Sequence, residues 1–185
     1  MLKTYFSHSV LGSLTEKIGS GKTPLGGERV YTKKGILFLR SQNIYPDCLH
    51  LDDVAYIPEA IDEEMSTTRV KMNDILLNIS GASIGRCTIF KLDEPANVNQ
   101  HVCIIRTFPD LSPLFLTYYL QSRFGQQQIF KYTTKGNREG LNFQQIGNFE
   151  IPIPTITEQN KINEMIGNIE ETYNQVLAHI NILIT

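Results

Sequence analysis

The sequence has no tryptophan, few cysteines and no long apolar run. Its 185 residues include only Cys48, Cys87 and Cys103, a small and odd number that is typical of reduced thiols in the cytoplasm. No run of about 18 apolar residues is present, so we expect no segment to cross a membrane. The first residues lack a continuous apolar stretch and a small-residue cleavage site, so secretion is not expected. The composition therefore predicts a cytoplasmic protein.

The chain also lacks a strong excess of charge of either sign. Charged residues make up 19%, apolar residues 41%, and the net charge is −2, so wholesale disorder is excluded and one domain with an appendage is expected. Residues 47–64 carry a charge of −7 and residues 158–185 carry −3, which leaves +8 for the rest. A positive body with separate acidic segments favours local phosphate binding. Acidic loops on a solvated surface explain the same pattern equally well.

Patterns that carry catalysis or bind metal are missing. The cysteines form no Cys-x-x-Cys pair, and the four histidines are scattered, none of them in a recognisable nucleophile motif. Gly19–Thr23 matches part of a phosphate-binding loop, but the full pattern needs a glycine where Glu16 stands and a helix where Pro24 stands. We therefore predict a non-catalytic chain without a metal site or a cofactor of its own.

Short apolar runs separated by turn residues predict strands over the first 110 residues. The expected strands are 36–39, 54–57, 75–79, 87–90 and 102–105. Their long connections indicate an irregular mixed sheet. A helix is expected over 112–132, with Ser112 as N-cap and Pro113 as its first residue. The fold class predicted is α+β, with an irregular mixed β-sheet, flanking helices and a long C-terminal coiled-coil helix.

The C-terminal segment has the most regular pattern. Thr155 and Glu158 form a capping box at a helix start. Apolar residues then recur at alternating spacings of 4 and 3. These are Ile162, Ile166, Ile169, Tyr173, Val176, Ile180 and Leu183. We expect this narrow stripe to pack on a partner helix; packing back onto the body is the alternative.

Several loops combine amide, hydroxyl and cationic side chains with glycine. Arg pairs with guanine edges, and Asn and Gln pair with adenine edges, while Lys, Ser and backbone amides hold phosphates. The candidate DNA contacts are Lys22, Thr23, Arg40, Gln42, Asn43, Ser83, Arg86, Asn99, Gln100, His101, Lys135 and Arg138. Such residues also build turns and caps, so each loop alone is weak evidence.

The order of motifs resembles the specificity (S) subunit of type I restriction–modification systems. The matching stretches are Gly21–Pro24, Gly35–Ile44, Asn73–Arg86, Asn97–Val102, Leu120–Gly140 and Ile151–Ile162, the last of which runs into the heptad helix. No single stretch is decisive. Together they cover nearly the whole chain in the family order.

The resemblance implies a target-recognition domain over 1–154 and a conserved-region helix over 155–185. It implies a subunit without catalytic activity that recognises double-stranded DNA and anchors a methyltransferase (modification) subunit and a restriction/translocase subunit. Those partners, not this chain, use S-adenosylmethionine, ATP and Mg²⁺. A complete S subunit carries two recognition domains, so this chain resembles half of one. A homodimer through the C-terminal helix would then recognise an interrupted palindrome.

Other interpretations remain open. The chain could serve a combined restriction enzyme–methyltransferase, or it could be an adaptor or decoy that binds partner subunits through its helix and contacts no DNA. A cryptic enzyme is a third alternative. The target bases, and the source of a partner helix, are not given by the sequence.

Overall fold

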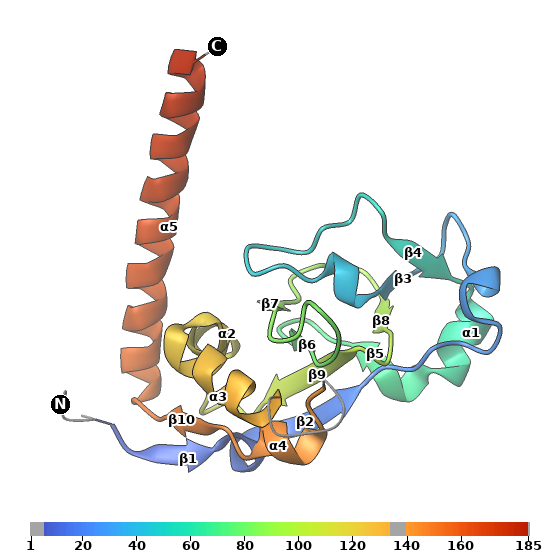
Figure 1. Ribbon diagram of the computed structural model, residues 1–185, viewed down its shortest axis with the longest axis horizontal. Coiled ribbons are helices and arrows are strands. Elements are labelled where there is room, and N and C mark those ends of the chain that lie inside the picture. The colour runs from blue at the N-terminus through green and yellow to red at the C-terminus, as the bar shows by residue number, and fades with distance from the viewer. Residues whose placement is uncertain (1–5, 134–139, 185) are drawn as a thin grey trace.

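Two four-stranded sheets and a group of helices form the body of the protein, from which a long helix extends (Figure 1). This computed structural model describes residues 6–133 and 140–184. The strands are β1 (His8–Val10), β2 (Thr15–Ser20), β3 (Ile36–Leu39), β4 (Ala55–Ile57), β5 (Arg69–Val70), β6 (Ile75–Asn78), β7 (Cys87–Ile89), β8 (Ala96–Val98), β9 (Val102–Thr107) and β10 (Glu150–Pro152). The helices are α1 (Glu59–Glu64), α2 (Pro113–Gln121), α3 (Arg123–Thr133), α4 (Phe143–Gly147) and α5 (Ile156–Ile184).

The first sheet has the order β2-β9-β6-β7 and is antiparallel throughout. Successive side chains of a strand point to opposite faces, so Ile75 and Leu77 of β6 pack against the helical layer. Leu116 of α2, Ile129 of α3 and Ile146 of α4 belong to the same buried cluster. Helices α2, α3 and α4 therefore cover one face of this sheet.

The opposite face of the first sheet packs on the second sheet. Leu76 of β6 and Ile104 of β9 share a buried cluster with Leu37 and Leu39 of β3 and Val98 of β8. The second sheet has the order β4-β3-β8-β5, and its β3–β8 pair is parallel. The two four-stranded sheets are therefore one antiparallel and one mixed sheet, where the sequence predicted a single mixed sheet.

The five predicted strands are confirmed within one or two residues at their ends. The single helix predicted over 112–132 is wrong, because Ser122 adopts an extended backbone (φ −65°, ψ 163°) and separates α2 from α3. Gly125 lies so close to Leu120 that a Cβ there would overlap the backbone of α2. The absence of a side chain at Gly125 thus allows α3 to approach α2 closely after the turn at Ser122.

The acidic segment 47–64 is not simply a solvated loop. Its last part forms α1, and Asp62 is 4% exposed. The Asp62 carboxylate accepts hydrogen bonds from Arg69 Nε (2.6 Å) and from Asn97 Nδ2 (3.0 Å). The interpretation of all seven acids as surface charges is therefore corrected for Asp62, which joins α1 to β5 and β8.

A short antiparallel pair, β1 with β10, closes the body near the start of α5. Ser9 lies opposite Ile151 in this pair, and the Ile153 N–H donates to the Ser7 carbonyl (2.8 Å). The pairing brings the first described strand next to the segment that leads into α5. The chain consequently enters and leaves the body at one place.

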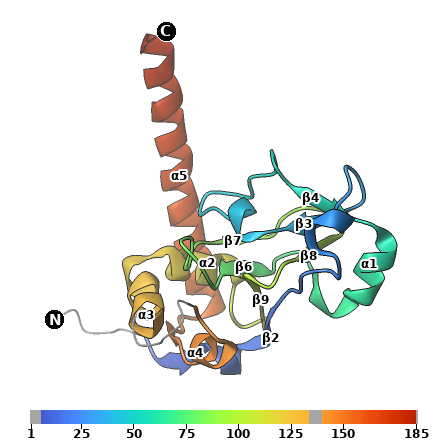
Figure 2. The same cartoon turned by 45° about the vertical axis from the view of Figure 1, so that its right-hand side comes forward.

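Helix α5 is anchored at its base and projects beyond it (Figures 1 and 2). The predicted capping box is present, with Glu158 Oε2 accepting from the Thr155 N–H (2.8 Å). Gln159 is buried and bonds to the backbone of residues 110, 112 and 154. Ile162 and Ile166 are partly buried, whereas the later apolar residues of the stripe are exposed. The side chain of Leu183 lies outside the described residues.

A second link joins α5 to α2. The Tyr118 hydroxyl donates to Glu170 Oε2 at 3.0 Å. Burial, followed by this hydrogen bond to a carboxylate, raises the pKa of Tyr118 to about 12, so the hydroxyl keeps its proton at neutral pH. The first positions of the stripe therefore pack on the body, as the second alternative expects. The later described positions are exposed, and their packing on a partner helix stays a prediction.

Candidate nucleic-acid interface

Four loops emerge at one edge of the two packed sheets. In the first sheet Ser20 pairs with Cys103, and Asn78 pairs with Val102, so the ends of β2 and β6 lie beside the start of β9. In the second sheet β3 and β8 are parallel and end together, with Leu39 opposite Val98. The segments that follow these strands must therefore lie close together. We call residues 22–23, 40–45, 80–86 and 99–101 the loop face.

Two adjacent hollows form the surface of the loop face. One is lined by residues of 41–45, by residues of 80–86 and by His101. The other is lined by Thr23, Arg40, residues 99–101 and further side chains of the 27–31 segment. Ser41, Gln42 and His101 line both. The surface is thus continuous and open, which suits an extended ligand better than an enclosed small molecule.

Gly21 explains why the Gly-Lys-Thr-Pro motif joins this surface. A Cβ at residue 21 would lie 1.6 Å from the Val98 carbonyl oxygen. Only glycine permits this approach, in which the Lys22 N–H donates to that same oxygen (3.2 Å). The motif is therefore a close backbone crossing that presents Lys22 and Thr23 as exposed side chains, and it is not a phosphate-binding loop.

Buried amides hold the loops in place. Asn43 is 2% exposed; its Oδ1 accepts from the Arg40 N–H (2.9 Å) and its Nδ2 donates to the His50 carbonyl (2.9 Å). Asn99 is also buried, and its Oδ1 accepts from the His101 N–H (3.1 Å). These two amides stabilise the loops from beneath, so we no longer place Asn43 and Asn99 among the side chains that would contact bases.

Asn78 was missed by sequence reasoning because it lies within an apolar strand. Its Nδ2 donates to the Ser41 carbonyl (2.8 Å) and to Ser83 Oγ (3.0 Å), so it ties two loops of the face together. An amide at the end of an otherwise buried strand is the signal that could have identified it, since such a group must find partners.

A chain of hydrogen bonds crosses the surface. Thr23 Oγ1 donates to Gln100 Oε1, and Gln100 Nε2 lies 3.0 Å from His101 Nε2. His101 Nδ1 in turn lies 2.5 Å from Ser80 Oγ. An amide nitrogen can only donate, so His101 Nε2 accepts and the ring proton belongs on Nδ1. Three of the predicted residues thus form one connected polar surface, with Ser80 as an addition.

Arg86 is the cation that the face leaves most available. Its guanidinium carbon lies 4.8 Å from the centre of the Tyr45 ring, and that ring stacks on His50 at 3.9 Å and 10°. Among the described residues no carboxylate forms an ion pair with Arg86. Its fork of N–H donors is therefore free for a ligand. Tyr45 was not among the predicted contacts, although an aromatic ring in a polar loop is a known stacking surface.

Arg40 and Gln42 are engaged within the chain. Arg40 Nη2 donates to the Asp53 carbonyl (2.8 Å) and lies 3.5 Å from Asp53 Oδ2, and the side chain is 16% exposed. Gln42 Nε2 donates to the same carboxylate at 2.7 Å. Either side chain would have to leave Asp53 to contact DNA. Lys135 and Arg138 lie outside the described residues.

No nucleophilic thiol lies in these hollows. Burial raises the pKa of Cys87 and of Cys103 to about 12, so both are neutral packing groups.

No helix in the described part of the chain is long and apolar enough to cross a membrane.

Comparison with known proteins identifies the family of the chain. Residues 10–185 match the model of the type I restriction modification DNA specificity domain. The chain belongs to this family. The EcoBI specificity subunit of Escherichia coli, a type I restriction enzyme subunit, is 31% identical over 159 residues, which is 80% of this chain and 33% of the relative.

Solved structures share the fold. One is a chain from a structure that describes complex assembly and conformational transition of the type I R-M system. It superposes on this chain with a TM-score of 0.71 and 17% identity, and the match covers 95% of this chain and 41% of that one. The HsdS subunit of Thermoanaerobacter tengcongensis gives a TM-score of 0.64 and 18% identity, covering 93% and 39%. The chain therefore spans about a third of the EcoBI subunit and about two fifths of these solved chains.

Proposed function

We propose that this chain is the DNA-recognition component of a type I restriction–modification complex and that the loop face contacts the DNA. The observation that carries the proposal is the convergence of loops from both sheets, which gathers Gln100, His101 and Arg86 on one open surface. Lys22 is exposed next to Thr23, which lines the same surface. Membership of the specificity family supports the same role. Catalysis would belong to the partner subunits.

The recognition mechanism would divide labour between side chains. Arg86 has the free donor fork that suits the O6 and N7 atoms of guanine, and Gln100 offers an amide for adenine. Lys22 is exposed beside them and would hold a phosphate, so affinity should fall as salt rises. The buried amides beneath fix these groups before DNA arrives, which reduces the ordering cost of binding.

Residues 1–154 would form the recognition domain and 155–185 a helix for subunit docking. The chain would act as half of a specificity subunit and pair with a second copy through α5 to recognise an interrupted palindrome. The exposed part of the α5 stripe supports a helical partner. A methyltransferase subunit and a restriction/translocase subunit would dock there, with S-adenosylmethionine, ATP and Mg²⁺ bound by those subunits.

Selection from a pool of randomised duplexes tests the proposal. The purified chain is used with and without its methyltransferase partner. Enrichment of an interrupted palindrome is the expected result. An asymmetric bipartite site would support DNA recognition but contradict the homodimer. If no sequence is enriched in either condition, the adaptor or decoy interpretation replaces this one. A partner that is a single-chain endonuclease–methyltransferase would favour the combined-enzyme alternative.

Variants of the loop face then locate the contacts. Arg86→Ala should weaken binding to the selected site by roughly 5- to 150-fold, equivalent to about 1–3 kcal/mol, and relax one base position. Arg86→Lys keeps the charge but loses the fork, so it should relax the same position. Lys22→Ala should weaken all sequences alike and reduce the salt slope by about one.

Lys71 supplies a matched control for Lys22. It precedes β6, whereas the loop face follows β6, so Lys71 lies at the opposite end of that strand. Lys71→Ala should leave affinity and salt slope unchanged. Equal effects of Lys22→Ala and Lys71→Ala would show that the loop face is not the DNA surface.

A further inference from the structure

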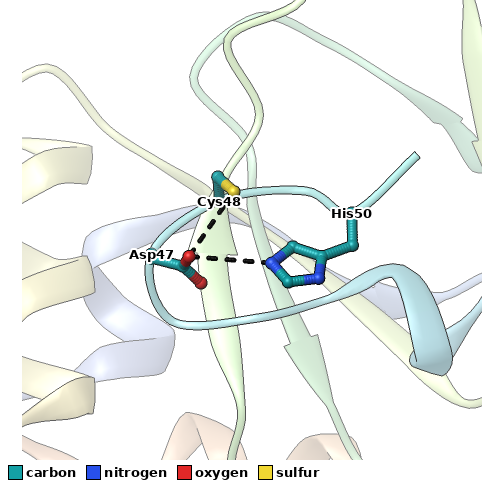
Figure 3. A group of neighbouring side chains, drawn as sticks. All are labelled: Asp47, Cys48 and His50. Atoms are coloured by element: carbon teal, nitrogen blue, oxygen red, sulfur yellow. Dashed lines mark hydrogen bonds and ion pairs between the residues drawn. The ribbon is translucent and has the colours of Figure 1, made fainter. Parts of the chain in front are cut away.

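A compact loop beside the loop face gathers three potential metal ligands (Figure 3). Asp47, Cys48 and His50 each offer one ligand atom, and these atoms all lie within 4.8 Å of one another. Asp47 Oδ2 lies 3.7 Å from Cys48 Sγ and 3.6 Å from His50 Nε2. All three residues are exposed. The sequence analysis predicted no metal site because the chain has no Cys-x-x-Cys pair. This cluster instead combines one aspartate, one cysteine and one histidine.

The spacing of the atoms fits a tetrahedral ion. Zinc binds thiolate sulfur at about 2.3 Å and imidazole nitrogen or carboxylate oxygen at about 2.0 Å. Two such ligands at a tetrahedral angle are separated by about 3.3–3.6 Å. The two edges from Asp47 Oδ2, at 3.6 and 3.7 Å, are within a few tenths of an ångström of this separation, and the third edge, from Cys48 Sγ to His50 Nε2, is at most 4.8 Å. An ion could therefore enter once the exposed Cys48 and His50 side chains close this third edge by at most about 1.2 Å.

The loop is held by backbone contacts and by the stacking of one ligand ring. Ile44 and Leu49 form an antiparallel bridge, and the Tyr45 N–H donates to the Cys48 carbonyl (3.2 Å). Gln121 Nε2 of α2 donates to the Pro46 carbonyl (2.7 Å). The His50 ring stacks on Tyr45, which holds its Nε2 toward Asp47. The loop that carries the three ligand residues is thus ordered before any ion binds, so binding loses less backbone conformational entropy.

The donor set selects the class of ion. Thiolate and imidazole are ligands of borderline-soft transition metals, whereas Mg²⁺ and Ca²⁺ prefer oxygen. We propose that Asp47, Cys48 and His50 bind a zinc ion that fixes the 44–50 loop and the Tyr45 ring beside Arg86. Binding breaks the Cys48 S–H bond, forms a sulfur–zinc bond and releases the proton to solvent. One coordination position stays open for water.

The consequence for the loop face rests on the proposed function, whereas metal binding does not. The Tyr45 ring contacts both the Arg86 guanidinium and the His50 ring. An ion on His50 would hold this stack in one arrangement and would neutralise the carboxylate and thiolate near the DNA surface. Zinc should therefore raise affinity for the selected duplex, and a chelator should lower it.

Cobalt substitution tests the site directly. The metal-free chain is titrated with Co²⁺, and thiolate coordination is detected by its near-ultraviolet charge-transfer band and its visible bands. We expect one equivalent to bind and zinc to displace it. Cys48→Ser should abolish the charge-transfer band, and His50→Gln and Asp47→Asn should weaken binding at least tenfold.

Asp52→Asn and His179→Gln are matched controls, since both residues are exposed and lie outside the cluster. Neither should change the titration. Absence of a charge-transfer band in the native chain would overturn the proposal. So would equal affinity in all variants, which would indicate adventitious metal binding only. If cobalt binds as expected but no duplex is ever selected, the metal site stands and the proposed DNA function fails.

Discussion

At the scale of single residues, a buried ion pair supports the sheet that carries the loop face. Asp74 accepts from Arg106 Nε and Nη2, each at 2.7 Å, and from the Lys71 N–H at 2.7 Å. The side chain of Asp74 is 1% exposed. The hydrogen bonds to Asp74 raise the pKa of Arg106 above its ordinary value. The carboxyl group of Asp74 thus accepts three hydrogen bonds inside the protein.

Removal of Asp74 leaves the Arg106 guanidinium, whose side chain is 19% exposed, without its carboxylate partner, and leaves the Lys71 N–H without its acceptor. Asp74→Ala should therefore lower the free energy of unfolding by about 1–3 kcal/mol. Asp93 is exposed, and Asp93→Ala should change stability by less than about 0.5 kcal/mol. Urea denaturation of the two variants gives the comparison. An Asp74→Ala variant as stable as Asp93→Ala would contradict the assigned role of the pair.

The three thiols should differ in reactivity. Cys48 is exposed, whereas burial raises the pKa of Cys87 and Cys103 to about 12. At pH 8, with a chelator present, a disulfide reagent should titrate one thiol in the folded protein and three in denaturant. Cys48→Ser should leave none reactive in the folded state. Rapid reaction of two or more thiols would show that the core is more open than described.

The same two thiols make stability depend on pH. Their pKa rises from an ordinary 9.0 to about 12 on folding, so the folded state holds these protons more tightly. Their contribution to stability is complete below about pH 9 and is lost as the pH rises toward 12. We expect the free energy of unfolding to decrease over that range, and Cys87→Ala or Cys103→Ala to reduce the decrease.

Some side chains that the sequence offered as DNA contacts lie in the predicted loops but are not exposed there. Asn43 and Asn99 lie in the predicted loops, yet both are buried and bonded to backbone. A sequence shows that an amide is present in a loop. It does not show which way the side chain turns, because that depends on contacts with distant segments such as the β3–β8 pair.

At the scale of elements, two glycines offer a sharp comparison. A Cβ on Gly21 would lie 1.6 Å from the Val98 carbonyl oxygen, whereas nothing lies within 4 Å of a Cβ on Gly167 in α5. Gly21→Ala should destabilise the protein by about 1–3 kcal/mol or more, and Gly167→Ala should stabilise α5 by up to about 1 kcal/mol. Thermal unfolding measures both. Equal midpoints would contradict the crossing at Gly21.

The sequence predicted the strands that have a continuous apolar run. It did not predict the elements that lack such a run. The run 75–79 predicted β6, which is buried on both faces. Strand β2 (Thr15–Ser20) is half-buried and polar, and β8 is three residues long, so neither has a local signal. Helix α1 lies in a segment whose acidity favoured a loop. Its stability comes from Asp62 pairing with Arg69, a contact that no local pattern encodes.

At the scale of the whole molecule, α5 extends well beyond its support. Ile169, Tyr173, Val176 and Ile180 are 67%, 62%, 52% and 44% exposed. Such a stripe on a projecting helix fits a second helix. The sequence predicted the helix, its cap and the stripe. It could not predict the convergence of the loop face, because that depends on which strands pair.

The homodimer is tested on this stripe. A variant with both Ile169→Glu and Val176→Glu should be monomeric in analytical ultracentrifugation, since two charges would be buried in the helix pair. Ala178→Glu is the control, because residue 178 is exposed on the side of the helix opposite the stripe, and it should sediment like the native chain. A native chain that is monomeric at all concentrations, with or without these changes, would refute the homodimer.

The pairing of β1 with β10 bears on how this architecture can vary. Because the two strands lie side by side where α5 begins, the body is a closed unit whose two ends meet. Units of this kind tolerate circular permutation and tandem duplication, since neither sheet has to be interrupted. A second copy of the body could therefore follow the helix within one polypeptide, and a new start could be opened in a surface loop without dismantling the core.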